Sequence, residues 1–318
     1  MTHYRPAVQT TLAEQVILEG IGVHSGAPAS LIVHPASPDT GILFVRTGLS
    51  GGHEVEVPAK VSAVSSTDLC TSIGSARGIS IATVEHLLAA LSGLGVDNAV
   101  IEIDSDEVPI MDGSSEAFVE EFDRVGLRHH SAMRKFIRVD KPVRFENGEA
   151  YGELLPYNGR RFEIEIDFDS HIVGYQKIAF DLDADTFRRD LSRARTFGFM
   201  RDVERLWAAG FALGASLDNT VVIGESSLVN PEGLRFEDEF VRHKALDAVG
   251  DLALAGAPIL GNYRSSRGGH KVNCGVVAAL LADRDAWTLV EEEPARREGG
   301  YAEFGALAPA PVYKPSVS

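Results

Sequence analysis

The sequence lacks the features that mark disulfide-stabilised, secreted and membrane-spanning proteins. Its 318 residues include two cysteines, Cys70 and Cys274, and no CxxC motif. This fits a reducing compartment and argues against a disulfide framework. No run approaches the roughly 18 apolar residues of a membrane span, and the N-terminus lacks the charged-then-apolar plan of a signal peptide. We therefore expect a cytoplasmic protein without a transmembrane segment.

The sequence also lacks an excess of basic residues. It has 30 Lys and Arg residues and 46 Asp and Glu residues, so its formal net charge is −16. Such a charge argues against a general surface for nucleic acids or anionic membranes. A small anionic substrate would instead depend on a few placed cations. Hydrophobic residues make up 44% of the chain, which is ample for a core, and we expect a monomer.

The predicted elements follow the same order in the two halves of the chain. In each half, several short strands come first, a histidine then opens a buried apolar helix, and another strand follows. These histidines are His86 and His243. In the second half, the first strand is predicted at Phe136–Phe145, and a helical segment starts with Phe180–Asp190. The repeated order suggests an internal duplication.

We therefore expect an α/β (α+β) fold of two similar domains, which agrees with the length of the chain. The domains are placed at residues 1–127 and 136–292, with the polar and basic segment 126–135 as the linker. Each domain is expected to be a β-sheet layered with helices. The helices of the two domains would pack together, with the active site at their interface. The Ala- and Pro-rich tail, residues 293–318, is expected to be poorly ordered.

Three polar side chains follow one stripe of the apolar segment Gly233–Leu254. His243, Asp247 and Asp251 are spaced i, i+4 and i+8, which places them on one face of a helix. Buried polar groups need partners, and a metal ion accepts both neutral imidazole and carboxylate as ligands. The alternative is a packed core helix with a satisfied histidine and ordinary carboxylates. The stripe alone favours neither interpretation.

A catalytic zinc site typically has three protein ligands and an open fourth position, so a further ligand must come from elsewhere. His86 is the best candidate, because it opens the buried helix at the equivalent place in the first half. Glu85 would then lie beside the open position and could take a proton from a water there. The alternative role of Glu85 is a negative charge that favours a helix N-terminus.

Two histidines beside glycines are further candidates. His270 follows a pair of glycines, and an imidazole on a flexible loop suits a general acid for a leaving amine, with Asp251 as its support. His24 lies in the segment GIGVHSG, where glycines allow a tight turn. The alternatives are a surface-loop histidine and a simple hairpin turn. Three cations are placed to meet substrate phosphates: Lys244, Arg267 and Lys271.

Several long motifs give the chain a family resemblance from Gln9 to about Glu292. They are GIGVHSG, TVEHLLAALSGLGVDNAVIEI, VPIMDGSS, SRARTFGFMRD, LRFEDEFVRHKALDAVGDL and the GGHKVN loop. With these motifs the sequence resembles the zinc-dependent UDP-3-O-acyl-N-acetylglucosamine deacetylases of bacterial lipid A synthesis. The resemblance implies hydrolysis of the acetamide of UDP-3-O-(3-hydroxyacyl)-N-acetylglucosamine, with release of acetate.

The resemblance also implies the roles of the catalytic residues. The metal is implied to be zinc, with Fe²⁺ as the alternative, held by His86, His243 and Asp247. Glu85 is implied as general base and His270 as general acid, with Asp251 supporting His270. Thr196 is implied to hydrogen-bond the tetrahedral intermediate.

Further residues are implied to contact the substrate. Lys244 corresponds to a substrate-binding position, and Phe197 would lie near the acyl chain. Positions that line the family's active site or the nucleotide end are His24, Cys70, Asp167 and Phe168. The insert at about 203–222 is implied to form a passage for the acyl chain. The alternative without such a function is a helix packed on its own sheet. Arg267 stands where Lys is common in the family, which keeps the charge but changes the donor geometry.

Two other functions remain open at this point. One is a zinc amidohydrolase that acts on another acylated amino sugar. The other is a binding module without catalysis, in which zinc is structural. Glu85 and His270 argue against a binding module, because neither residue is needed as a ligand.

Overall fold

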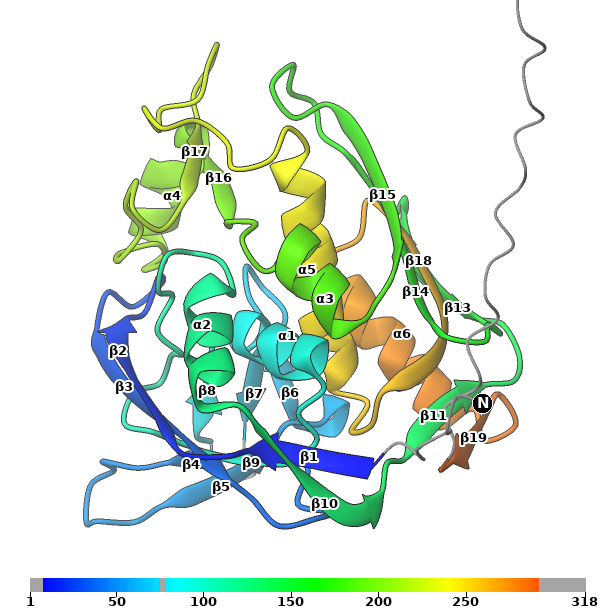
Figure 1. Cartoon of the computed structure of the whole chain (residues 1–318). Coiled ribbons are helices and arrows are strands. Elements are labelled where there is room, and N and C mark those ends of the chain that lie inside the picture. The colour runs from blue at the N-terminus through cyan, green and yellow to red at the C-terminus, as the bar shows by residue number, and fades with distance from the viewer. Residues whose placement is uncertain (1–7, 75–77, 292–318) are drawn as a thin grey trace, which may run out of the picture.

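The computed structural model describes residues 8–74 and 78–291, and two β-sheets enclose a layer of helices (Figure 1). The first sheet is built from the first half of the chain. Its strand order is β2 (Val16–Ile21), β3 (Pro28–Pro35), β9 (Ala99–Ile103), β4 (Ile42–Arg46) and β5 (Val55–Pro58). Only β9 and β4 run parallel, and the other neighbours are antiparallel. Alternate side chains of these strands, such as Leu31 and Val33, face the buried helices.

The second sheet repeats this plan. Its equivalent strands are β12 (Val143–Asn147), β13 (Ala150–Leu155), β18 (Ile259–Ser266), β14 (Arg160–Asp167) and β15 (Tyr175–Asp181). Among these five strands, again only the central pair, β18 and β14, is parallel. Two short strands extend the sheet: β11 (Phe136–Val139) and β19 (Trp287–Val290). The same order and the same directions therefore occur in both halves of the chain.

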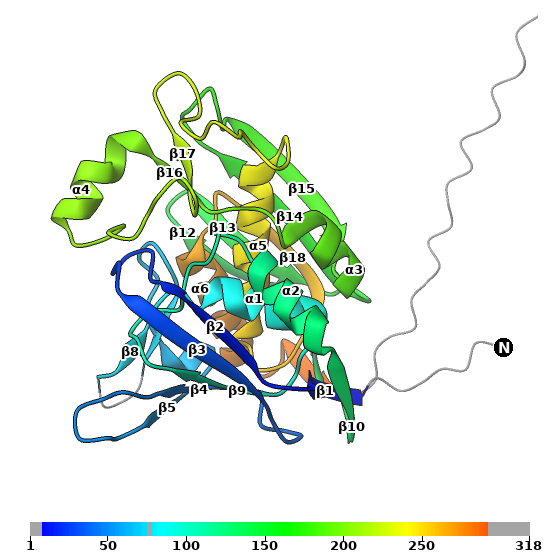
Figure 2. The ribbon, with the colours of Figure 1, turned by 60° about the vertical axis from the view of Figure 1, so that its left-hand side comes forward.

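Four helices form the middle layer between the sheets (Figures 1 and 2). They are α1 (Glu85–Leu94), α2 (Glu116–Val125), α5 (Glu239–Ala253) and α6 (His270–Ala282). Helices α1 and α5 are buried along almost their whole length, as expected of helices that are apolar on most sides. Their backbones touch at Gly250, where an added Cβ would lie 2.0 Å from the Glu85 carbonyl oxygen.

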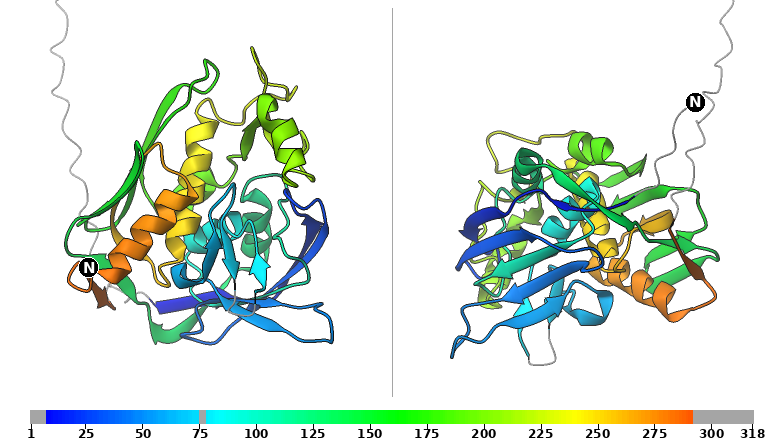
Figure 3. Two further views of the ribbon diagram at one scale, coloured as in Figure 1. Left: turned by 180° about the vertical axis from the view of Figure 1, so that it is seen from behind. Right: turned by 60° about the horizontal axis from the view of Figure 1, so that its bottom comes forward.

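Each half also carries an insert between its fourth strand and its central helix. The first insert holds η1 (Val61–Ala63), β6 (Val64–Ser66), β7 (Ser72–Gly74) and β8 (Ser80–Ile81). The second insert holds α3 (Ala184–Thr186), η2 (Phe187–Leu191), β16 (Phe197–Phe199), η3 (Met200–Asp202), α4 (Val203–Ala208) and β17 (Val221–Ile223). In Figure 2, α4 stands out from the body of the molecule above β2 and β3. Seen from behind in Figure 3, the first insert lies beside α6.

The structure differs from the sequence-based prediction at several elements. The segment 126–135 contains strand β10 (Leu127–Met133), which pairs antiparallel with β1 (Val8–Leu12). The single strand predicted at Phe136–Phe145 is divided into β11 and β12. The helical segment predicted from Phe180 is wrong at its start, because β15 continues to Asp181 and Asp183 then caps α3 through its side chain.

The prediction for His270 also needs correction. This residue is not on a flexible loop: it is the first residue of α6, and its side chain is buried. The predicted tail, residues 293–318, lies outside the described residues. Within the ranges 8–74 and 78–291, no helix is long and apolar enough to cross a membrane.

Candidate active site

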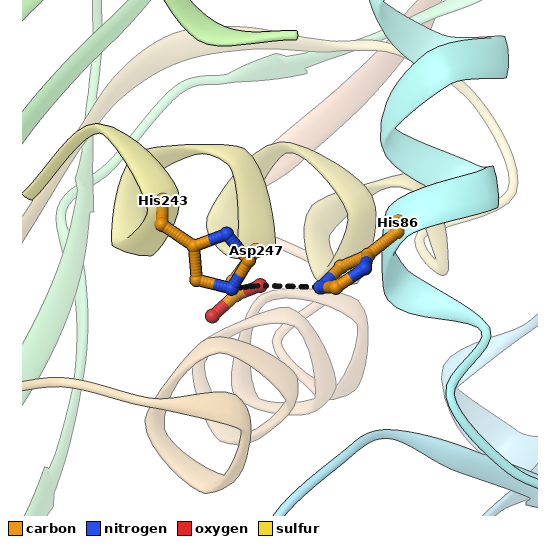
Figure 4. A group of neighbouring side chains, drawn as sticks. All are labelled: His86, His243 and Asp247. Atoms are coloured by element: carbon orange, nitrogen blue, oxygen red, sulfur yellow. Dashed lines mark ion pairs between the residues drawn. The ribbon is translucent and has the colours of Figure 1, made fainter. Parts of the chain in front are cut away.

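Two imidazoles and a carboxylate meet where α1 packs against α5 (Figure 4). His86 comes from the first turn of α1, while His243 and Asp247 lie one turn apart on α5. Asp247 Oδ1 is 3.5 Å from His86 Nε2 and 3.3 Å from His243 Nε2. One ligand atom from each residue lies within 4.8 Å of the other two. The group predicted from the helical stripe and the opening of the other helix is therefore assembled.

The donor atoms of this group fit a metal ion. Asp247 Oδ1 is buried and has no hydrogen-bond partner among the described residues, whereas Oδ2 accepts a hydrogen bond from Lys244 Nζ at 2.8 Å. His243 Nδ1 faces the Ala194 carbonyl oxygen at 3.0 Å, which leaves the lone pair of Nε2 free to coordinate a metal ion. Burial lowers the pKa of His243 to about 3 against the charge of Asp247. The imidazole is therefore neutral, as a metal ligand must be.

Glu85 lies beside this group, in the first turn of α1. Its side chain is buried, and Oε2 accepts a hydrogen bond from the Thr71 backbone amide at 3.1 Å. Burial raises the pKa of Glu85, although the neighbouring histidines His270 and His86 oppose the rise. A carboxylate with a raised pKa is suited to accept a proton near neutral pH.

His270 faces Glu85 from the N-terminus of α6. Its Nε2 is 3.7 Å from Glu85 Oε1, and its Nδ1 is 2.9 Å from Asp251 Oδ2. Burial opposes the positive charge, but the carboxylates of Asp251 and Glu85 outweigh it and raise the pKa of His270 to about 9. The imidazole is therefore protonated at neutral pH and oriented by Asp251, so that it can donate a proton from Nε2.

Thr196 and Phe197 are held close to α5 by the preceding arginine. Arg195 donates from its backbone amide and its Nε to Glu239 Oε1, both at 2.9 Å, at the start of α5. Thr196 itself donates its amide to the Gly113 carbonyl oxygen at 2.7 Å. These buried bonds fix the backbone that carries the predicted oxyanion residue and the residue after it.

An aromatic group lies next to the group of His86, His243 and Asp247. The ring centroid of Phe197 is 6.2 Å from that of His243, 4.9 Å from that of Phe240 and 5.7 Å from that of Phe168. Lys244 Nζ lies 5.6 Å from the centre of the Phe197 ring. Three of the predicted substrate-binding residues are thus brought together beside His243.

His24 and Cys70 lie on the first half's side of the site. Burial lowers the pKa of His24, and the charges of His270 and His86 add to this effect while Glu107 opposes it. The His24 ring also packs edge-on against Phe211 of the second insert, with 5.5 Å between centroids. The segment GIGVHSG contains the turn between β2 and β3, and the role of His24 in the site stays a prediction.

Cys70 is buried and close enough to Glu85 for their charges to interact. Burial and the charge of Glu85 raise the pKa of Cys70 to about 12. The residue is therefore a neutral thiol at ordinary pH, which argues against a nucleophilic or metal-binding role.

Arg267 and Asp167, both predicted to bind substrate, form an ion pair at the surface. Arg267 Nη2 is 2.5 Å from Asp167 Oδ2, and Nη1 pairs with Glu149. The side chains of Arg267 and Asp167 are 45% and 42% exposed, so a ligand can reach them from solvent. Phe168, next to Asp167, links this surface to the aromatic group described above.

Sequence reasoning missed several residues that organise the site. Thr71 and Asn273 both donate to Asp251, and Tyr263 donates to Asn273 Oδ1 at 2.6 Å. Glu107 accepts hydrogen bonds from the His24 and Ser25 amides and so shapes the turn that carries His24. Asn273 lies in α6 and the others lie at single positions in strands and loops, where no periodic pattern distinguishes them.

Comparison with known proteins agrees with this geometry. The family model for UDP-3-O-acyl N-acetylglycosamine deacetylase matches residues 9–282. The proteins of Brucella ovis and Brucella melitensis biotype 2 named UDP-3-O-acyl-N-acetylglucosamine deacetylase are each 57% identical to the chain over 286 residues. That alignment covers 90% of this chain and 99% of each relative. The chain therefore belongs to the UDP-3-O-acyl-N-acetylglucosamine deacetylase family.

Proposed function

We propose that the protein hydrolyses the acetamide of UDP-3-O-(3-hydroxyacyl)-N-acetylglucosamine, releasing acetate and the free 2-amino sugar nucleotide, as a step of lipid A biosynthesis. Family membership and the names of the relatives support this substrate. The observation that carries the chemistry is the pair Glu85 and His270, a buried base and a buried acid that face each other beside His86, His243 and Asp247.

The group of His86, His243 and Asp247 would hold the metal, which we propose is zinc. Two imidazoles and a carboxylate are a common ligand set for catalytic zinc. When bound, zinc polarises a carbonyl oxygen and makes a nearby water a better nucleophile at neutral pH. Lys244, which donates to the far oxygen of Asp247, orients that carboxylate so that Oδ1 faces the two imidazoles.

The protein's own residues then move the protons. Glu85 takes a proton from the water that attacks the acetamide carbonyl carbon, since its raised pKa makes it an effective base. Thr196 donates a hydrogen bond to the oxygen on which negative charge develops. His270 gives its Nε2 proton to the departing nitrogen, because an amide nitrogen leaves readily only as a neutral amine. Asp251 keeps the His270 ring oriented throughout, because its Oδ2 accepts the hydrogen bond from Nδ1.

The remaining contacts bind the two ends of the substrate. We propose that Arg267, Asp167 and Phe168 meet the nucleotide end, and that Phe197 meets the acyl chain. The second insert supplies the passage for the acyl chain. Exposed apolar side chains of the insert support this passage, and they include Trp207, Leu213 and Leu217. The insert also bonds to the turn of His24, through the Leu213 amide to the His24 carbonyl oxygen at 3.0 Å.

Metal content and acetate release, measured on the same preparation, test this function. Chelation is expected to abolish acetate release from the acylated sugar nucleotide, and added zinc is expected to restore it. The variants H86A and H243A are expected to lose both the metal and the activity. Full activity in metal-stripped protein would overturn the proposal. Acetate release from acylated amino sugars without the nucleotide would instead favour the alternative amidohydrolase.

A single-turnover assay of E85A separates an enzyme from a binding module. We expect this variant to retain its metal, because Glu85 is not one of the three clustered ligands, and to release acetate at least 100-fold more slowly than the wild type. Wild-type protein that binds the substrate and releases no acetate would identify a binding module with a structural metal.

A further inference from the structure

Thr71 lies between Glu85, which we assign as the general base, and Asp251, which we assign as the residue that supports the general acid His270. It comes from the insert of the first half, just before β7, and its side chain is completely buried. Its hydroxyl donates to Asp251 Oδ1 at 2.5 Å, across 180 residues of sequence. Its backbone amide donates to Glu85 Oε2 at 3.1 Å. One residue is therefore bonded to both carboxylates, through two different groups.

The hydroxyl bond completes the surroundings of Asp251. The other oxygen, Oδ2, accepts from His270 Nδ1 at 2.9 Å and from Asn273 Nδ2 at 2.8 Å. Asn273 is fixed in turn by Tyr263. A fully buried carboxylate needs donors on both oxygens, and in the described chain Thr71 is the donor to Oδ1. Without it, Oδ1 loses this bond, and the carboxylate can rotate away from His270.

The direction of this bond is fixed by chemistry. Asp251 is an acceptor as a carboxylate, so the threonine hydroxyl must donate its proton to Oδ1. Thr71 therefore holds one oxygen of the Asp251 carboxylate, while the other oxygen, Oδ2, lies 2.9 Å from His270 Nδ1. The effect reaches the substrate only through Asp251 and His270, which makes Thr71 a positioning residue.

We propose that the Thr71 hydroxyl positions Asp251 for acid catalysis by His270, while the Thr71 backbone amide fixes the Glu85 carboxylate. This inference rests on the proposed deacetylase function. Asp251 lies on α5 and His270 on α6, so Thr71 is a residue of the first half of the chain that supports an acid from the second half. The two groups of Thr71 can be tested separately, because a side-chain substitution removes the hydroxyl and leaves the amide.

The test compares T71V with T71S in the zinc-loaded, full-length protein. T71V keeps the shape and loses the hydroxyl, so kcat is expected to fall about 10- to 100-fold, as is typical when a supporting hydrogen bond behind a site is lost. KM and zinc content are expected to stay at the wild-type values. T71S restores the hydroxyl and is expected to regain most of the activity. Wild-type kcat in T71V would overturn the proposal.

A double-mutant cycle with D251N shows whether Thr71 acts through Asp251. If it does, the loss caused by T71V shrinks to near nothing in the D251N background. An equal loss in both backgrounds would overturn the proposal, and so would loss of zinc from T71V. If T71V does not fold, T71A and T71S are compared instead, and equal kcat values for these two would overturn it.

T11V is the matched control for the removal of a buried, hydrogen-bonded hydroxyl. Thr11 is also completely buried, and its hydroxyl donates to the Asn98 carbonyl oxygen at 2.7 Å, in β1 and outside the candidate site. T11V is expected to lose stability and keep the wild-type kcat. A fall in kcat equal to that of T71V would show that a general loss of stability explains both. Wild-type protein that releases no acetate would instead refute the deacetylase function itself.

Discussion

At the residue scale, the charge of Asp251 decides the protonation state of His270. The imidazole is buried, which by itself would favour the neutral form. The neighbouring carboxylates reverse this preference and raise the pKa of His270 to about 9, from an ordinary value near 6.5. The same residue type at position 243 is kept neutral, with a pKa of about 3. The two histidines therefore differ in protonation state, as their proposed tasks of proton donation and metal binding require.

Acetate release is expected to fall as the pH rises through about 9. The raised pKa means that the His270 imidazolium is fully present well below this pH and is lost above it. In D251N, the charge that holds the proton is removed, so the upper inflection of the pH–rate profile is expected to move to lower pH. Profiles of kcat for the two proteins measure the shift. An inflection at the same pH in both would contradict the assignment of His270 as the acid.

Arg267 is expected to affect binding of the nucleotide and little else. It is exposed and paired with Asp167 and Glu149, and surface ion pairs contribute little to stability. R267A is therefore expected to raise KM several-fold while kcat and the melting temperature stay near the wild-type values. R138A is the control, because Arg138 on β11 is similarly exposed and pairs with Asp140. An unchanged KM in R267A would remove Arg267 from the substrate site.

At the scale of elements, the close approach of α1 and α5 depends on Gly250. In most helices, replacing glycine by alanine is favourable by about 1 kcal/mol. At Gly250, however, the added Cβ would lie 2.0 Å from the Glu85 carbonyl oxygen, so the helices would have to separate. His86 and Glu85 would then move away from His243 and Asp247, which α5 carries.

G250A is therefore expected to lower the free energy of unfolding by about 1–3 kcal/mol, as overpacked cores do, and to weaken metal binding. Denaturant unfolding and zinc titration measure the two effects. G198A is the control, since a Cβ at Gly198 meets no atom within 4 Å and its backbone is not left-handed. A wild-type free energy of unfolding in G250A would contradict this, because it would mean that the helices can separate without loss of stability.

The helices of the site were easier to predict than the elements around them. The spacing of His243 and Asp247 is a direct consequence of helical geometry, and His86 opens the most apolar helix of the first half. Two strong local signals misled the prediction elsewhere. The glycines before His270 indicate a loop, yet the apolar run after it forms α6, and Asp251 holds the imidazole inside. In β15, exposed and partly buried residues alternate as far as Asp181, and the helical segment predicted from Phe180 overlooks the end of this alternation.

At the scale of the whole molecule, the two halves repeat one sheet plan, and the site lies between their central helices. The order of elements along the chain and the two paired helices could be predicted from the sequence, because each half shows its own local pattern. The bond from Thr71 to Asp251 could not, because it joins positions 180 residues apart and involves residue types that are common everywhere. The domain boundaries at 127 and 136 stay predictions.

Metal binding is expected to stabilise the molecule as a whole. A ligand that binds only the folded chain adds about 2.7 kcal/mol to the free energy of unfolding when its free concentration is 100 times Kd. Zinc should therefore raise the melting temperature of the wild type, and the shift should be lost in D247N, which lacks a charged ligand. Thermal unfolding with and without zinc measures this. An equal shift in D247N would place the stabilising metal elsewhere.

The division of the ligands between α1 and α5 has a consequence for the order of events during synthesis. His86 leaves the ribosome long before His243, so the nascent first half can offer only one of the three donors. On the proposed zinc site, a single imidazole would hold the ion weakly, and the full set of ligands would form only when α5 has docked on α1. Metal content would then report that the two halves of the chain have met.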